Sequence, residues 1–321
     1  MTEYLKLIDG EMHMIRDESL RLRTIYIGGG SPSLLSVREL DFLMQRVRRH
    51  FPFSNPEECS IEANPEDLNP DWLRGARHCG VNRISIGVQS LDEAVLRRLG
   101  RLHLPETGLR AVSTAAESGF VNLNTDLIIG IPGQTDAGIR AEIRRLGSLP
   151  ITHLSVYLLE QTPEDTLSRE FSGSRNYTAA VAAAEETGFS RYEVSSFSRH
   201  GAECRHNLTY WNNEEYLGVG LSAAGYLDGL DFCNTKRMNR YAQGIQAGRR
   251  IGRRRRIPAA QRRLATGLRL VTGVPVETAA ARMESIQPLL GADIMRIRNG
   301  RLSVAPDHML MLNEILARYV L

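Results

Sequence analysis

The sequence predicts an α/β fold built on a parallel sheet, followed by a smaller second domain. Short apolar, β-branched runs recur along the chain with helical stretches between them, and this alternation is typical of a parallel sheet. The chain has 321 residues, of which 42% are hydrophobic, and this suffices for one large and one small domain. The predicted strands are Thr24–Ile27, Cys59–Ala63, Arg83–Val88, Val121–Ile129, His153–Leu158 and a weaker run at Arg191–Val194.

Start and stop signals frame the helices between these runs. Ser36 and Glu39 have the spacing of a capping box, in which each side chain bonds the other residue's backbone N–H. Asn69 followed by Pro70 is typical of an N-cap with proline in the first turn. Gly100 is placed to end the preceding helix, because glycine readily adopts the left-handed conformation needed there.

Polar residues and glycines gather where the predicted strands end. Each group alone has a simpler structural explanation: a tight turn, an Asn-Pro turn, or a buried carboxylate whose hydrogen bonds are made. Barrel enzymes place their sites at the carboxyl ends of the strands, and here the pattern repeats over four or five strands, so we expect a binding site. The residues are Gly28, Gly29, Gly30, Ser31 and Pro32; Glu62, Asn64 and Pro65; Gln89 and Ser90; Asp126 with Gly130–Gly133; and Tyr157.

The chemistry of these side chains indicates the kind of ligand. Glycines allow close approach of the backbone, and Glu62 can pair with an ammonium group. Gln89 and Asp126 can hydrogen-bond ribose hydroxyls, and Arg101 can pair with a carboxylate. A ligand with an amino-acid end and a nucleoside end fits this set, and S-adenosylmethionine (SAM) is such a ligand.

Composition excludes several classes of protein. No run of about 18 apolar residues occurs, so no membrane span is expected. The first residues, MTEYLKLIDGEM, lack the apolar core of a signal peptide, so we expect a cytoplasmic protein. The net charge of +3 indicates no particular partner, and no nucleic acid is expected. The cysteines, Cys59, Cys79, Cys204 and Cys233, do not have a metal-ligand spacing.

Several long, collinear motifs resemble one family. IGGGSPSLLS resembles the GGGTP segment of radical SAM proteins. IEANPEDL, RISIGVQSLDEAVLRRLGRLH, NLNTDLIIGIPGQT and HLSVYLLEQTP resemble the barrel motifs of the coproporphyrinogen dehydrogenase group. RYEVSSFSRHGAECRHNLTYWNNEEYLGVG resembles the HemW heme chaperones, and Arg205–Trp211 contains their HNxxYW signature. The resemblance extends from about Thr2 to the C-terminus.

The resemblance implies a role for each site residue. Gly29, Gly30 and Ser31 would hold the methionyl end of SAM, with Glu62 on its amino group and Arg101 on its carboxylate. Gln89 and Asp126 would bind the ribose, and Ile128 would pack near the adenine. His206 would be the candidate heme ligand, with Arg205 on a propionate and Tyr210 and Trp211 against the porphyrin. The alternative is that His206 and Asn207 only fix the loop while Trp211 packs in the core.

The sequence departs from the family in three places. The family begins with a strand and a CxxxCxxC loop that holds a 4Fe–4S cluster, whereas this chain begins at the following helix, with Tyr4, Leu5, Ile8, Met12 and Ile15 roughly on one face. A histidine of the relatives aligns with Ala224, and the segment Phe171–Tyr177 looks shortened. The chain is either a truncated or wrongly started gene product or a cluster-free derivative. We favour the first, because a missing strand leaves an open sheet edge.

The C-terminal part has a different composition, and we expect domains at residues 1–234 and 235–321. Arg249–Arg256 is predicted to be an exposed linker. Helices are expected at Pro258–Leu270, Val276–Met283 and Asp307–Val320, and a hairpin at Arg296–Val304 turning at Asn299-Gly300. This order resembles the C-terminal domain of the family and also a winged helix.

The expected fold is therefore a partial (β/α) barrel of radical SAM type that lacks its first strand, with a small winged-helix-like α+β domain. The expected function is that of a HemW-like chaperone that binds heme and SAM and delivers heme to acceptor proteins, without radical catalysis in this chain. Two alternatives stay open: oxygen-independent coproporphyrinogen III oxidation, and nucleic-acid binding by the C-terminal domain.

Overall fold

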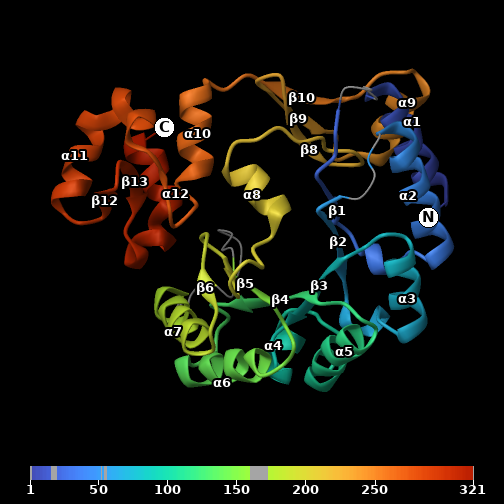
Figure 1. Ribbon diagram of the computed structural model, residues 1–321, viewed down its shortest axis with the longest axis horizontal. Coiled ribbons are helices and arrows are strands. Elements are labelled where there is room, and N and C mark those ends of the chain that lie inside the picture. Colours follow the sequence, from blue (N-terminus) through green and yellow to red (C-terminus); the bar gives the residue numbers. More distant parts are fainter. Residues whose placement is uncertain (1, 16–19, 52, 54–55, 160–172, 321) are drawn as a thin grey trace. The chain divides into compact units, whose positions relative to one another are not determined.

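The computed structural model describes residues 2–15, 20–51, 53, 56–159 and 173–320 (Figure 1). Phe171, the first residue of the segment that was expected to be shortened (Phe171–Tyr177), lies outside the described residues. The chain divides into two compact units. Unit 1 is Met1–Ile25, Leu35–Glu57 and Arg205–Leu321, and unit 2 is Tyr26–Leu34 and Glu58–Cys204. The domain boundary expected after residue 234 stays a prediction.

The main sheet has seven strands in the order β1-β2-β3-β4-β5-β7-β6. Strands β2 to β5 pair in parallel, and β7 and β6 join antiparallel at one edge. The predicted α/β fold is confirmed, and the first five strands differ from their predicted ends by one residue at most. The strands are β1 Thr24–Ile27, β2 Glu58–Ala63, β3 Arg83–Gln89, β4 Asn122–Ile129, β5 His153–Leu158, β6 Ser190–Arg191 and β7 Ser196–Ser198.

Helices of unit 2 lie along one side of this sheet (Figure 1). The predicted cap at Asn69 is confirmed, because its side chain accepts a hydrogen bond from Trp72 N–H. Gly100 follows α4 with a φ of 67°, which confirms the predicted stop. The elements are η1 Pro32–Leu34, η2 Pro65–Asp67, α3 Pro70–His78, α4 Glu93–Arg98, α5 Pro105–Glu117, α6 Asp136–Gly147 and α7 Gly173–Glu186.

The two faces of β2 to β5 have opposite chemistry, because side chains alternate along a strand. One face is apolar and buried, and it consists of Cys59, Ile61, Ala63, Ile84, Ile86, Val88, Leu123, Leu127, Ile129, Leu154 and Val156. The other, here called the polar face, consists of Glu58, Ser60, Glu62, Arg83, Ser85, Asn124, Asp126, His153 and Ser155. The strand register places Ser85 between Glu62 and Asn124, and His153 beside Asn124. The sheet thus brings charged and amide side chains from four strands into adjoining rows.

Unit 1 joins the first helices to the chain beyond residue 204. Ser36 and Glu39 form the predicted capping box at the start of α2. The helices are α1 Thr2–Ile15, α2 Val37–His50, α8 Arg205–Trp211, α9 Met238–Gln246, α10 Ala259–Gly267, α11 Met283–Gly291 and α12 Leu312–Ile315. The 3-10 and π segments are η4 Val276–Arg282, η5 Pro306–Met311 and η6 Leu316–Val320. The strands are β8 Ala224–Leu227, β9 Leu230–Asn234, β10 Gly252–Arg255, β11 Val274–Pro275, β12 Met295–Arg298 and β13 Arg301–Val304.

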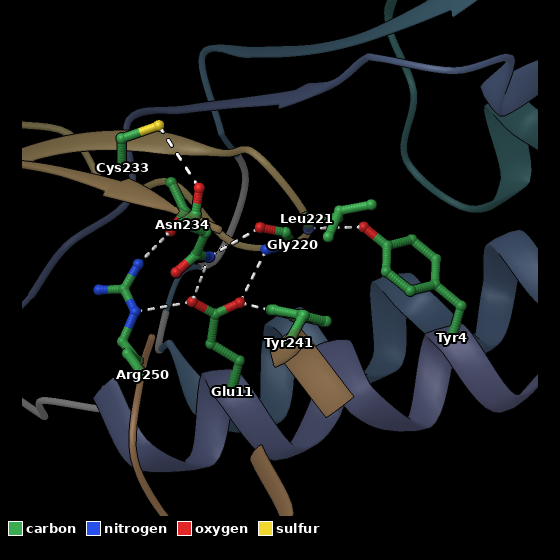
Figure 2. Close-up of polar contacts among 9 residues, drawn as sticks. Tyr4, Glu11, Gly220, Leu221, Cys233, Asn234, Tyr241 and Arg250 are labelled. Atoms are coloured by element: carbon green, nitrogen blue, oxygen red, sulfur yellow. Dashed lines mark hydrogen bonds and ion pairs between the residues drawn. The ribbon is translucent and has the colours of Figure 1, made fainter. Parts of the chain in front are cut away.

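A buried carboxylate ties α1 to the second half of unit 1. Glu11 is fully buried, and Figure 2 shows four donors around it. Its Oε1 accepts from Asn234 Nδ2 and Arg250 Nε at 2.7 Å each. Its Oε2 accepts from Tyr241 Oη at 2.7 Å and Gly220 N–H at 2.8 Å. Each oxygen thus has two donors, and Arg250 supplies the opposite charge.

The C-terminal region combines helices with a small sheet, as expected, and it corrects the details of the prediction. A small sheet in the order β11-β13-β12 packs with α10 and α11, and its hairpin turns at Asn299 and Gly300 with positive φ. The helix predicted from Val276 is a 3-10 segment followed by α11. We missed α11 because Pro288 lies inside it, and proline usually ends a helix. The final helix is broken into η5, α12 and η6.

The prediction that the arginine-rich segment is a linker is wrong. Gly252–Arg255 forms β10, the edge strand of a sheet in the order β10-β9-β8. The segment is exposed, as expected, but β-structure was missed because four consecutive arginines carry no apolar alternation. Arg254 instead packs its guanidinium over the ring of Phe232 on β9. No described helix is both long and apolar enough to cross a membrane.

The Glu11 cluster predicts a large stability effect. Glu11→Gln places an amide N–H against donors and removes the charge opposite Arg250, so we expect a loss of about 3 kcal/mol in the free energy of unfolding. Urea denaturation would measure it. Glu3→Gln is the control on the same helix, because Glu3 is 85% exposed and should not change stability measurably. Equal stability of the two variants would contradict the role given to Glu11.

Candidate functional site

The turn after β1 wraps around the carboxylate of Glu62. Gly29 N–H donates to Glu62 Oε2 at 2.9 Å, and Tyr26 Oη donates to Oε1 at 2.9 Å. Gly29 and Gly30 have φ values of 81° and 70°, which glycine adopts without strain. A side chain on Gly28 would lie 2.6 Å from the Tyr26 ring. The turn therefore needs its glycines, and Ser31 follows as the residue before η1.

The end of β3 carries backbone strain at Gln89. Its φ is 66°, although it is not glycine, and the pairing of β3 with β4 becomes irregular between Ile86 and Gln89. Non-glycine residues in this conformation cost energy and gather at functional sites. The next residue, Ser90, bonds both oxygens of Glu142 at 3.0 Å, and Leu91 N–H donates to the same carboxylate. Glu142 thus holds the strained turn in place.

Asp126 lies on the polar face near the end of β4. Its Oδ1 accepts from Asn124 Nδ2 at 2.8 Å, and its Oδ2 accepts from Ser85 Oγ at 2.9 Å. Burial raises the pKa of Asp126 above its usual range, while these bonds and the charge of Arg83 act in the opposite direction. Burial raises the pKa of Tyr26, and the negative charges of both Glu62 and Asp126 raise it further. The structure therefore brings Glu62 and Asp126 to one region.

Arg101 and Ile128 complete the predicted set. Arg101 follows α4, and its side chain makes no hydrogen bond or ion pair with any described residue. Ile128 is partly exposed on β4 and lies beside Tyr157 of β5. Gln134 braces the following turn by bonding the carbonyl of Ile128 at 3.2 Å. Ile128 thus supplies an apolar side chain at a strand end, whereas Arg101, whose guanidinium has no partner among the described residues, lies between α4 and α5.

The second candidate site lies in unit 1, on α8. His206 Nδ1 is 2.8 Å from Thr24 Oγ1, and His206 Nε2 is 2.6 Å from Tyr210 Oη. Tyr210 lies one turn along the helix and also contacts the ring of Tyr216. Both nitrogens of His206 are therefore engaged. A metal ion could reach this imidazole only if one of these hydrogen bonds opened.

The neighbours of His206 also have partners. Arg205 and Arg23 both pair with Glu57, and these hydrogen bonds hold the pKa of Glu57 below its usual range. The Arg269 guanidinium lies over Trp211, 5.3 Å from the ring centroid, and the buried indole N–H has no hydrogen-bond partner among the described residues. Arg205 can reach an anion only by leaving Glu57.

Comparison with known proteins identifies the family. Residues 5–146 match the family model described as the radical SAM superfamily. A protein named heme chaperone HemW from Lactococcus lactis is 32% identical over 296 residues, covering 88% of this chain and 78% of the relative. Proteins of that name from Bacillus subtilis and Escherichia coli are 35% and 36% identical, covering 74% of this chain and 67% and 65% of the relatives. The chain belongs to the HemW family.

The fold of a solved structure agrees with this family. Coproporphyrinogen III oxidase (HemN) from Escherichia coli, described as a radical SAM enzyme, superposes with a TM-score of 0.85. The match covers 99% of this chain and 83% of HemN at 21% identity, which shows a shared fold. The predicted radical SAM type of architecture is confirmed. The HemW relatives, being closer in sequence, give the better guide to this chain.

Two departures from the HemW pattern can be located in the structure. Cys59, Cys79 and Cys204 are buried, and Cys233 lies on β9 of the other unit. Among the described residues no three His, Cys, Asp or Glu side chains are grouped to hold a metal, so these residues do not fit a 4Fe–4S cluster. Ala224, where the sequence predicts a departure from the family pattern, begins β8 and is exposed.

Sequence reasoning missed part of the polar face. Tyr26, Ser85, Asn124 and His153 contact predicted site residues or one another, but we had named none of them. The available signal was the period of two in RISIGVQ, NLNTDLII and HLSVYL, where polar residues alternate with apolar ones. In a buried parallel sheet such alternation indicates that one face has a polar lining.

The raised pKa of Asp126 predicts how stability depends on pH. The folded protein holds this proton more tightly than the unfolded chain, whose aspartates titrate at about 3.9. Ionisation of Asp126 therefore lowers the free energy of unfolding as pH rises from that value through the raised pKa, with no further change above it. Asp126→Asn lacks this ionisation, so we expect it to be more stable than wild type at neutral pH.

Urea denaturation of both proteins at several pH values would measure the difference, which should shrink as pH falls toward the unfolded pKa. Asp71→Asn is the control, because the side chain of Asp71 is 91% exposed. A variant at Asp126 that is less stable than wild type at neutral pH would show that the bonds from Ser85 and Asn124 outweigh burial.

Proposed function

We propose that this chain acts as a HemW-type heme chaperone, which binds SAM at the strand ends of unit 2 and binds heme for delivery to acceptor proteins. The observation that carries the proposal is the membership of the HemW family together with the polar strand-end cluster. The relatives are named heme chaperones, and the cluster has the donors and acceptors that SAM requires.

The residues of unit 2 fit SAM group by group. Arg101 has no partner among the described residues and can pair with the carboxylate. Glu62 can accept from the amino group, with Gly29, Gly30 and Ser31 close to the methionyl chain. Asp126 and Gln89 can bind the ribose hydroxyls, and Ile128 can contact the adenine. The ammonium and the carboxylate of bound SAM would then each face a side chain of opposite charge, Glu62 and Arg101 respectively.

The proposal concerns binding and transfer by the residues that the structure describes. Cleavage of SAM requires a reduced cluster, and the described cysteines do not fit one. HemN-like oxidation of coproporphyrinogen would depend on that step, and the structural likeness to HemN shows the fold alone. Heme handling is the better-supported activity, because relatives at 32 to 36% identity are named heme chaperones.

Heme is cargo in this proposal, and His206 is its candidate ligand. Neutral imidazole is a usual axial ligand of heme iron. His206 Nδ1–H can remain bonded to Thr24 and orient the ring, as hydrogen bonds do for metal-bound histidines. The Nε2 lone pair must first leave the Tyr210 hydroxyl. Tyr210 thus competes with iron, which suits a protein that has to release its cargo.

SAM binding can be measured by calorimetry on the purified chain. Asp126→Ala and Arg101→Ala each remove a charged partner of the ligand, and each should weaken binding by about tenfold or more. Asp71→Ala is the control, because Asp71 is exposed on α3. Unchanged affinity in both site variants would place SAM elsewhere, and no binding to the wild-type chain would exclude a SAM site.

Heme binding can be followed by the Soret band during titration. His206→Ala should abolish axial ligation, whereas Tyr210→Phe should tighten binding by about fivefold, because it removes one competing hydrogen bond and keeps the ring. His200→Ala, at an exposed histidine of unit 2, is the control. Identical titrations of wild type and His206→Ala would rule out His206 as the ligand.

A further inference from the structure

A continuous row of hydrogen bonds leads away from Asp126 across the polar face. Asn124 Nδ2 donates to Asp126 Oδ1 at 2.8 Å, and Asn124 Oδ1 is 2.6 Å from His153 Nδ1. His153 Nε2 is 2.9 Å from Tyr192 Oη, which accepts from the Cys204 N–H at 3.3 Å. All five residues belong to unit 2.

The protons in this row have only one consistent arrangement. Burial and the charge of Arg83 hold the pKa of His153 well below its usual range, so its ring is neutral and carries one N–H. The Asn124 amide must turn its nitrogen to the carboxylate of Asp126, which leaves its oxygen facing His153. The N–H of His153 is therefore on Nδ1.

The far side of the imidazole agrees with this tautomer. Burial raises the pKa of Tyr192, so its phenol keeps its proton and donates to His153 Nε2. The N–H of Cys204 supplies the hydrogen bond that the Tyr192 oxygen accepts. Every donor from Cys204 to Asp126 thus points the same way, and each bond polarises the next.

We propose that His153 is a positioning residue for the ribose: its Nδ1–H fixes the Asn124 amide, which in turn holds the Asp126 carboxylate in the orientation that binds the sugar hydroxyls. This inference rests on the proposed binding of SAM through Asp126. His153 itself does not touch the ligand, because it is fully buried at the start of β5. Its effect is carried entirely by Asn124.

Ser155 does not replace His153 in this role. Ser155 Oγ also lies 3.1 Å from Asn124 Oδ1, but its single proton is shared with the neighbouring Asp126 carboxylate. The shorter contact, 2.6 Å, is the one from His153. Without the imidazole N–H, the Asn124 oxygen keeps only the longer bond from Ser155, so the amide holds the Asp126 carboxylate less firmly in its orientation.

Two amide substitutions separate this role from simple packing. In His153→Asn, the amide nitrogen is separated from Cα by the same number of bonds as Nδ1 of the histidine. The variant therefore keeps a donor toward Asn124. In His153→Gln, the amide nitrogen is separated from Cα by the same number of bonds as Nε2 of the histidine. This variant therefore keeps the contact with Tyr192 but loses the donor toward Asn124. The two variants have similar polarity, and thermal unfolding would verify that both are folded.

The readout is the preference for ribose over a sugar without hydroxyls. Calorimetry would compare S-adenosylhomocysteine with its 2′,3′-dideoxy counterpart for wild type and each variant. We expect His153→Asn to keep the wild-type ratio of dissociation constants and His153→Gln to lower it by about tenfold, the factor for one hydrogen bond to a charged group. The affinity for the dideoxy ligand should change little.

The outcomes separate this inference from the proposed function. If both variants lose preference equally, or neither does, His153 does not position Asn124. If Asp126→Ala still lowers the ribose preference in that case, the proposed site stands and only the role of His153 fails. If Asp126→Ala leaves the preference unchanged, the ribose site itself is wrong.

Discussion

The polar face of the central sheet is the constraint on which unit 2 depends. A parallel sheet covered by helices is usually apolar on both faces, because a buried polar group costs free energy unless it is hydrogen-bonded. Here four strands carry carboxylates, amides and an imidazole on one face, and the neighbouring strands satisfy them. A shift of one residue in the register would turn these groups into the helix-covered face and bring apolar residues in their place. The polar groups therefore fix the register as firmly as the apolar core does.

The fold was predictable because its signals are local. The runs from Thr24 to Leu158, the cap at Asn69 and the stop at Gly100 depend on residues that are neighbours in sequence. The positions of Glu62, Gln89 and Asp126 on their strands were also predictable, because these polar residues stand in or end apolar runs, while their role in binding stays a prediction. Their partners were harder to identify. Which donor faces Asp126 depends on the pairing of β3, β4 and β5, and no single strand encodes that pairing.

The failures near the C-terminus have a different cause. Pro288 inside α11 and the arginines of β10 contradict the local preferences on which prediction relies. Tertiary contacts override those preferences: Arg254 packs on Phe232, and β10 pairs along its length with β9. Glu11 is a similar case. A glutamate at a helix position near Met12 looks like a surface residue until Asn234, Tyr241 and Arg250 are placed around it.

The partners of Glu11 lie 209 to 239 residues further along the chain. During synthesis α1 leaves the ribosome before the rest of unit 1, yet its carboxylate has no compensating donors until the chain has been extended past Arg250. Almost all of unit 2 comes from one continuous stretch, so it can acquire its core earlier. Contacts between distant residues form slowly, because a long loop must close before they stabilise anything. Unit 1 therefore closes after unit 2, and α1 remains without its partners until the segment that carries Arg250 has been made.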